Sequence, residues 1–168
     1  MDTATVEKLE QLFDQDQRAI RDFRSGIISS DELKRLQLEG GKTIRDLIES
    51  HGFPFPENAT EKAYKAAFLT VLHSPDANLM KKVLLAYESR GDSALRKDQA
   101  YLTDKILVFE GKPQLYGTQY KTGTEGSVTF FDTEEPDELD ARRIPMGLGT
   151  HAEYRDFILD NQREQETA

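Results

Sequence analysis

Residues 111–132, GKPQLYGTQYKTGTEGSVTFFD, contain the point at which the spacing of apolar residues changes. Before Gly111, apolar residues recur with the 3.6-residue period of helices, and after it they alternate as they do in strands. Residues 115–120 and 127–132 flank the turn sequence Lys-Thr-Gly-Thr-Glu-Gly at residues 121–126. This pattern predicts a mainly α fold with one small β-hairpin near residues 114–132.

Helical periodicity covers most of the chain before this stretch. The segments expected to be helical are residues 5–24, a segment that follows a cap at Ser30-Asp31-Glu32 and ends at His51, a segment that is capped by Asn58 or Thr60 and ends at His73, and residues 76–89 and 93–109. The second segment is expected to be interrupted at Gly40-Gly41, and a short last helix is expected at residues 152–159. The prediction is a single-domain helical bundle of five to seven helices over residues 1–160, with a frayed polar tail at residues 161–168.

The composition of the 168-residue chain excludes several classes of function. A net charge of −9 argues against nucleic acid as the main partner, because that binding needs clustered Lys and Arg. The absence of cysteine excludes disulfides, thiolate catalysis and Cys-ligated metal centres. No apolar run approaches the roughly 20 residues of a membrane span, and no signal-peptide pattern is present, so we expect a cytoplasmic protein. The sequence requires no cofactor and leaves the oligomeric state open.

Polar side chains interrupt the apolar faces of two predicted helices. Lys105 lies near the middle of the apolar arc of residues 93–109, with Asp104 beside it. A buried ammonium must be paired or lose its proton, whereas a snorkelling lysine packs its stem and keeps its charge in water. His73 ends the third helix, and Asp76, three residues later, is expected to orient its ring for acid–base chemistry. The alternative is a hydrogen-bonded core histidine that only caps the helix.

The third interruption is Asp16, which falls inside the apolar stripe of the first helix. We expect it to pair with Lys105, Arg142 or Arg143. An error of one residue in the helical phase would instead turn Asp14 towards the core.

The segment 114–120 carries two amides, two phenols and a threonine where a core strand would carry Val or Ile. Such neutral hydrogen-bonding groups indicate a polar pocket, and Gly117 leaves room there for a ligand or another backbone. Arg142 and Arg143 are candidates to clamp a carboxylate or phosphate. In the alternative interpretation, the Gln and Tyr side chains satisfy the hairpin's own backbone and hold the C-terminal segment in place.

A succession of short motifs resembles those of a bacterial family catalogued only as a domain of unknown function. The motifs are an Asp-Gln pair at Asp16-Gln17 or Asp14-Gln15, His51-Gly52-Phe53-Pro54, Leu72-His73-Ser74-Pro75-Asp76, Tyr101-Leu102-Thr103-Asp104-Lys105, the run from Gly111 to Gln119, Asp140 to Arg143, and Gly147-Leu148. The resemblance spans nearly the whole chain and implies a shared site, but it brings no known activity. Leu72 replaces the family's Gln, and Lys105 replaces its Arg, which permits a titratable amine.

These observations favour a small-molecule enzyme that performs acid–base chemistry on a polar, carboxylate-bearing substrate, in biosynthesis or hydrolysis. The candidate catalytic residues are His73, Asp76, Lys105 and Tyr116. The candidate substrate-binding residues are Asp16, His51, Asp104, Gln114, Gln119, Arg142 and Arg143. One alternative is a non-catalytic interaction or immunity-type protein, whose acidic surface would attract a basic partner. Another is a metal-dependent enzyme that uses His51, His73 and Asp76 with Asp104 or Asp16.

Overall fold

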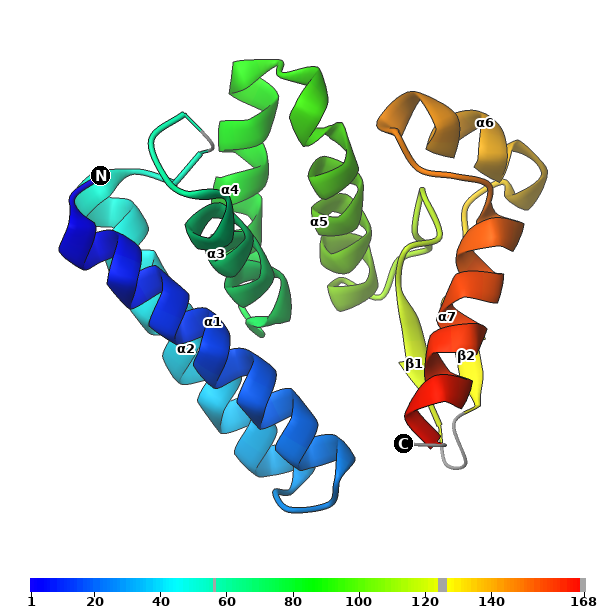
Figure 1. Ribbon diagram of the computed structural model, residues 1–168. Coiled ribbons are helices and arrows are strands. Elements are labelled where there is room, and N and C mark those ends of the chain that lie inside the picture. Colours follow the sequence, from blue (N-terminus) through cyan, green and yellow to red (C-terminus); the bar gives the residue numbers. More distant parts are fainter. Residues whose placement is uncertain (56, 124–126, 167–168) are drawn as a thin grey trace. The chain divides into compact units, whose positions relative to one another are not determined.

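The computed structural model describes residues 1–55, 57–123 and 127–166, with the side chains of these residues up to 162. Within these ranges the chain is mainly helical and contains one two-stranded antiparallel sheet, which confirms the predicted fold class (Figure 1). The chain divides into two compact units, Met1–Ala86 and Tyr87–Ala168. The single domain expected from the sequence stays a prediction. No helix in the described ranges is long and apolar enough to cross a membrane.

The first unit is built on three capped helices and contains most of a fourth. The bounds are α1 Thr3–Arg24, α2 Ser30–His51, α3 Glu61–His73 and α4 Ala77–Arg90. Side-chain oxygens of Asp2, Ser29 and Thr60 accept backbone N–H groups in the first turns of α1, α2 and α3. These caps satisfy donors that have no partner inside a helix, so they fix where each helix begins. Helix α1 packs against both α2 and α3 (Figure 1).

Helix α2 continues through Gly40 and Gly41, so the predicted interruption is wrong. Both glycines face α3. A Cβ at position 41 would lie 2.9 Å from the Cβ of Ser74, and one at position 40 would lie 3.5 Å from Cγ2 of Thr70. Gly41 is therefore needed for the close approach of α2 to the end of α3, whereas a Cβ at position 40 would make an ordinary contact. The packing at Gly41 outweighs the poor helix propensity of glycine. Ile44, one turn further along α2, is fully buried.

The second unit places a hairpin and several short helices around α5. Its elements are η1 Ser93–Leu95, α5 Arg96–Phe109, β1 Tyr120–Thr122, β2 Val128–Phe130, η3 Pro136–Glu138, α6 Leu139–Arg143, η4 Ile144–Met146 and α7 His151–Glu166. The two strands are antiparallel, with Tyr120 opposite Phe130. Helix α7 extends beyond its predicted end, and residues 161–166 of the expected frayed tail are helical. Residues 124–126 of the predicted turn and residues 167–168 lie outside the described part of the chain.

The predicted strand at residues 115–120 is wrong except for its last residue, because the chain forms a loop from Gln114 to Gln119. Gly117 has a φ of +61°, which is incompatible with a regular strand. Backbone N–H groups of this loop donate to a side chain of α5, so they are unavailable to a sheet. The first strand begins at Tyr120, directly after the loop residues whose N–H groups donate to Asp104.

Candidate functional site

The first unit holds a histidine–aspartate pair at the end of α3. Nδ1 of His73 lies 2.7 Å from Oδ2 of Asp16 on α1. The side chain of Asp16 is only 9% exposed and that of His73 is 26% exposed. Asp14, by contrast, is 64% exposed and lies 3.8 Å from the ammonium of Lys62. Asp16 therefore faces inward, as the apolar stripe of α1 indicated.

Asp76 was expected to orient His73, but its carboxylate is used elsewhere. It accepts the backbone N–H of Leu79 at 3.0 Å, which caps α4, and it pairs with Arg45 of α2. Because Asp76 follows the Ser-Pro turn, it serves the next helix instead of the preceding one. Asp16 makes the contact with His73, and within the first unit its hydrogen-bond partners are His73 and Gln17, not the basic residue expected from the sequence.

The contact between Asp16 and His73 determines what the imidazole can do. When Nδ1–H of a neutral ring donates to a carboxylate, the lone pair of Nε2 is left free to accept a proton. In the described ranges, Nε2 of His73 has no hydrogen-bond partner. The carboxylate also stabilises the imidazolium that forms after proton transfer, as in other histidine–aspartate pairs. The arrangement is suited to a general base that later returns its proton as a general acid.

A cavity of about 270 Å³ lies between α1, α2 and the C-terminal half of α3, and we call it the Asp16 cavity. Its polar lining consists of Gln15, Asp16, Gln37, Glu39, Thr43 and Thr70, and no Lys or Arg is among the described residues that line it. The Oγ1 of Thr70 is buried and has no hydrogen-bond partner in the described part of the chain. A buried hydroxyl without a partner is costly, so a polar ligand in this cavity would gain a hydrogen bond there.

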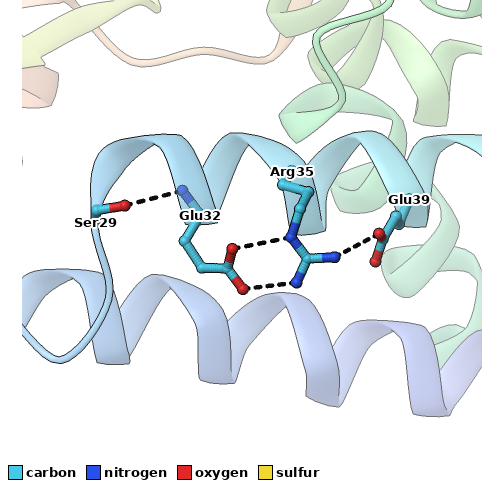
Figure 2. Close-up of polar contacts among 4 residues, drawn as sticks. All are labelled: Ser29, Glu32, Arg35 and Glu39. Carbon is cyan, nitrogen blue, oxygen red and sulfur yellow. Dashed lines mark hydrogen bonds and ion pairs between the residues drawn. The ribbon is translucent and has the colours of Figure 1, made fainter.

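Glu39, at the exposed edge of the Asp16 cavity, is held by an ion-pair cluster along α2 (Figure 2). Arg35 donates to Glu39 at 2.6 Å and to both oxygens of Glu32 at 2.6 and 2.9 Å, while the N–H of Glu32 donates to Ser29. These bonds raise the pKa of Arg35, mainly through Glu32. Arg35 is thus an ion-pair partner that Glu39 shares with Glu32, whereas Asp16 is the lining carboxylate without a Lys or Arg partner among the described residues.

In the second unit, Asp104 organises the loop 114–119. Its carboxylate is fully buried and accepts the backbone N–H groups of Leu115, Tyr116 and Thr118 at 2.7, 2.9 and 2.9 Å. The hydroxyl of Thr118 donates to the same group at 2.8 Å. Four donors saturate the two oxygens, so a buried charge is tolerated here through hydrogen bonds instead of a counter-ion. The carboxylate predicted to bind substrate is occupied by the protein's own backbone.

Gln114 holds the loop from its other side. Its amide nitrogen donates to the carbonyls of Gln119 and Phe131 at 3.1 and 2.9 Å, and its oxygen accepts the N–H of Gln119 at 2.8 Å. The side chain is fully buried. The amide nitrogen of Gln119 donates to Oγ1 of Thr118 at 3.0 Å. The geometry thus matches the alternative interpretation, in which these amides satisfy the loop's own backbone.

Arg142 and Arg143 bind carbonyl groups and do not form one clamp. Arg142 donates to the carbonyl of Leu115 at 2.9 Å and to those of Glu134 and Glu135. Arg143 is only 1% exposed; it donates to the carbonyl of Gly149 at 2.8 Å and to that of Tyr116. Both guanidinium groups therefore anchor the loop 114–119 to the C-terminal segment.

The remaining predicted residues lie apart from the histidine–aspartate pair along the chain. Lys105 and Tyr116 belong to the second unit, whereas His73 and Asp16 belong to the first. Burial lowers the pKa of Lys105, and burial together with the nearby Asp104 raises the pKa of Tyr116. His51 ends α2 with its Nε2 3.8 Å from Asp2. In the described ranges no three His, Asp or Glu side chains converge in a geometry that would hold a metal ion.

His151, the first residue of α7, was not among the residues predicted for the site. Its ring packs edge-on against Phe130 with centroids 4.8 Å apart, and a Cβ at Gly117 would lie 2.9 Å from its Cδ2. Its Nε2 is buried and has no partner in the described chain, and burial lowers its pKa. The available signal was Thr150, whose hydroxyl accepts the N–H of Glu153 and so places His151 in the first turn of a helix.

A second cavity, of about 310 Å³, lies between α5, α7 and the turn that precedes α7. We call it the Arg143 cavity. Its lining includes Arg143 and Lys97, the carboxylate of Glu153, and the rings of Tyr101 and Tyr154. This cavity was not predicted from the sequence, because no role was expected for α7 and its aromatic residues.

Comparisons with other proteins give one match. No curated protein and no solved structure matches the chain, whereas the model of a family of unknown function, DUF6624, matches residues 32–163. The match covers α3 to α6 and most of α2 and α7, and it confirms the resemblance to a family without a known activity. The chain belongs to the family of unknown function DUF6624.

Proposed function

We propose that this protein is an enzyme that performs acid–base chemistry on a small polar molecule, with His73 as the residue that transfers the proton. The observation that carries the proposal is the 2.7 Å contact between Nδ1 of His73 and a largely buried Asp16. Asp16 acts as the positioning residue that holds the ring in one tautomer. Nε2 of His73 then removes a proton from a water molecule or a substrate hydroxyl.

The Asp16 cavity indicates the part of the substrate that lies near this pair. Its lining combines amides, hydroxyls and carboxylates without Lys or Arg among the described residues, which favours hydroxyl or amine groups over anions. The Oγ1 of Thr70 supplies a free donor and acceptor for such a group. A carboxylate elsewhere on the substrate, as expected from the sequence, would have to be bound outside this cavity.

Lys105 and Tyr116 stay proposed catalytic groups of the second unit. The lowered pKa of Lys105 supports its use as a neutral amine, and the raised pKa of Tyr116 keeps its phenol protonated as a hydrogen-bond donor. Asp104, Gln114 and Gln119 are better regarded as the support of this loop, because protein groups fill their main hydrogen-bonding positions.

The proposal is tested by incubating the purified protein with a bacterial metabolite extract and following every species by mass spectrometry. We expect at least one polar metabolite to be consumed, and His73→Gln to slow its loss about 100-fold or more. His51→Gln is the matched control, since His51 also ends a helix, but the aspartate nearest to it, Asp2, is exposed and 3.8 Å away instead of buried and in hydrogen-bond contact. Circular dichroism establishes that both variants fold. An unchanged extract, or equal turnover by His73→Gln, would contradict the proposal and favour the non-catalytic interaction protein.

A further inference from the structure

The Arg143 cavity contains a buried positive charge that lacks a carboxylate partner. The guanidinium of Arg143 is fixed by the carbonyls of Gly149 and Tyr116, and it lies 5.2 Å from the centroid of the Tyr154 ring. In the described part of the chain, it forms no ion pair, and its Nη2 has no hydrogen-bond partner. Asp140 and Asp104 attract this cation without forming an ion pair with it, and an anion in the cavity would offset part of the remaining cost of its burial.

The charges around the cavity favour a ligand with one negative charge. Lys97 is a second cation, exposed at the start of α5. The only carboxylate among the described lining residues is Glu153, which accepts the N–H and hydroxyl of Thr150 at 2.8 and 2.9 Å. The lining thus carries one net positive charge when Arg143, Lys97 and Glu153 are ionised.

The walls of the cavity are suited to an apolar body. The rings of Tyr101 and Tyr154 meet edge to face with centroids 6.3 Å apart, and Leu148 is buried beside them. Tyr154 donates its hydroxyl to the carbonyl of Thr118 at 3.0 Å, which fixes the ring under Arg143. Burial raises the pKa of Tyr154, so this phenol stays neutral and adds no charge to the cavity.

We propose that the Arg143 cavity binds the carboxylate of a small organic molecule with an apolar body. The guanidinium of Arg143 receives the carboxylate through its unpartnered N–H groups, and Lys97 adds long-range attraction from the rim. The aromatic walls cover the apolar part of the ligand, and a volume of about 310 Å³ accommodates a molecule of single-ring size. This inference concerns the second unit alone and does not depend on acid–base chemistry at His73.

The test uses benzoate as the probe, with binding to the full chain measured by saturation-transfer NMR and titration. Benzamide is the neutral control of equal shape, and phenyl phosphate distinguishes a dianion from a carboxylate. We expect saturable benzoate binding that is at least about tenfold tighter than benzamide binding, because a charge-assisted hydrogen bond is lost in the amide. Benzoate that binds no better than benzamide, or more weakly than phenyl phosphate, would overturn the assignment.

Variants locate the site. Arg143→Lys keeps the charge but loses the planar fork, so benzoate affinity is expected to fall about tenfold or more. Because Arg143 also supports the loop, Lys97→Glu provides an independent test at an exposed position and should weaken binding several-fold by reversing a charge. Arg155→Gln is the matched control, since Arg155 lies on α7 outside the cavity lining and pairs with Asp156. Wild-type affinity in both Arg143→Lys and Lys97→Glu would overturn the proposal even if benzoate binds.

Discussion

Replacement of Asp104 by asparagine should destabilise the second unit strongly. Each carboxylate oxygen of Asp104 accepts two donors. An Asn NH₂ group would face either two backbone N–H groups or the N–H of Thr118 and its hydroxyl, which would have to rotate to accept, so two charge-assisted hydrogen bonds are lost in either orientation. A hydrogen bond to a charged acceptor contributes about 1.5–3 kcal/mol, and the loss of two such bonds predicts a decrease of about 3–6 kcal/mol in the free energy of unfolding. The side-chain volume hardly changes, so the loss would report the hydrogen bonds.

The assay combines urea denaturation, followed by circular dichroism, with amide hydrogen exchange measured by NMR. In Asp104→Asn the amides of Leu115, Tyr116 and Thr118 should exchange at least about 100-fold faster than in the wild type, as a local loss of about 3 kcal/mol requires. Asp137→Asn is the control, because Asp137 is exposed in the same unit and should change stability by less than about 0.5 kcal/mol. Unchanged stability and unchanged protection of the three amides would refute the assignment of Asp104 as the anchor of this loop.

Three further predictions concern strain and buried charge. Gly117→Ala should cost about 1–2 kcal/mol of stability by urea denaturation, and more than Gly111→Ala, because both glycines have positive φ but only position 117 places a Cβ against His151. Lys105→Met should raise the free energy of unfolding at neutral pH by about 1 kcal/mol, because burial lowers the pKa of Lys105 and the folded state therefore binds that proton less tightly than the unfolded chain. The gain should shrink as the pH rises towards 10.5, and a loss of stability at neutral pH would contradict this prediction. His151→Gln should lessen the loss of stability on acidification. Because burial lowers the pKa of His151, the unfolded chain binds the proton more tightly than the folded state as the pH falls through 6.5. Identical pH profiles of the melting temperature in the variant and the wild type would exclude this effect.

The sequence was sufficient to predict the helices because their signals are local. Thr60 and the apolar period mark where α3 begins, while the cap of α2 is Ser29, one residue before the predicted Ser30. The interruption predicted at Gly40-Gly41 is wrong because the reason for Gly41 lies at Ser74, the residue that follows α3. A contact between residues about 30 positions apart leaves no local pattern.

The candidate site was predicted only in part, because the contacts that build it join residues far apart in the sequence. The inward position of Asp16 followed from helical phase, but its pairing with His73 depends on how α1 packs against α3. The polar segment 114–119 was correctly singled out, but its alternation suggested a strand because nothing local shows that Asp104 takes up its backbone donors. In the sequence, polar side chains that hydrogen-bond to a distant part of the backbone look the same as polar side chains that bind a ligand.

The most direct test of the proposed function is the tautomer of His73, read from nitrogen-15 shifts of the imidazole at a pH where the ring is neutral. We expect a proton on Nδ1 and a free Nε2 in the wild type, and a shift towards the Nε2–H form in Asp16→Ala, with His51 unchanged in both proteins. A wild-type ring already protonated on Nε2, or a ring indifferent to the loss of Asp16, would contradict the claim that Asp16 prepares His73 to accept a proton.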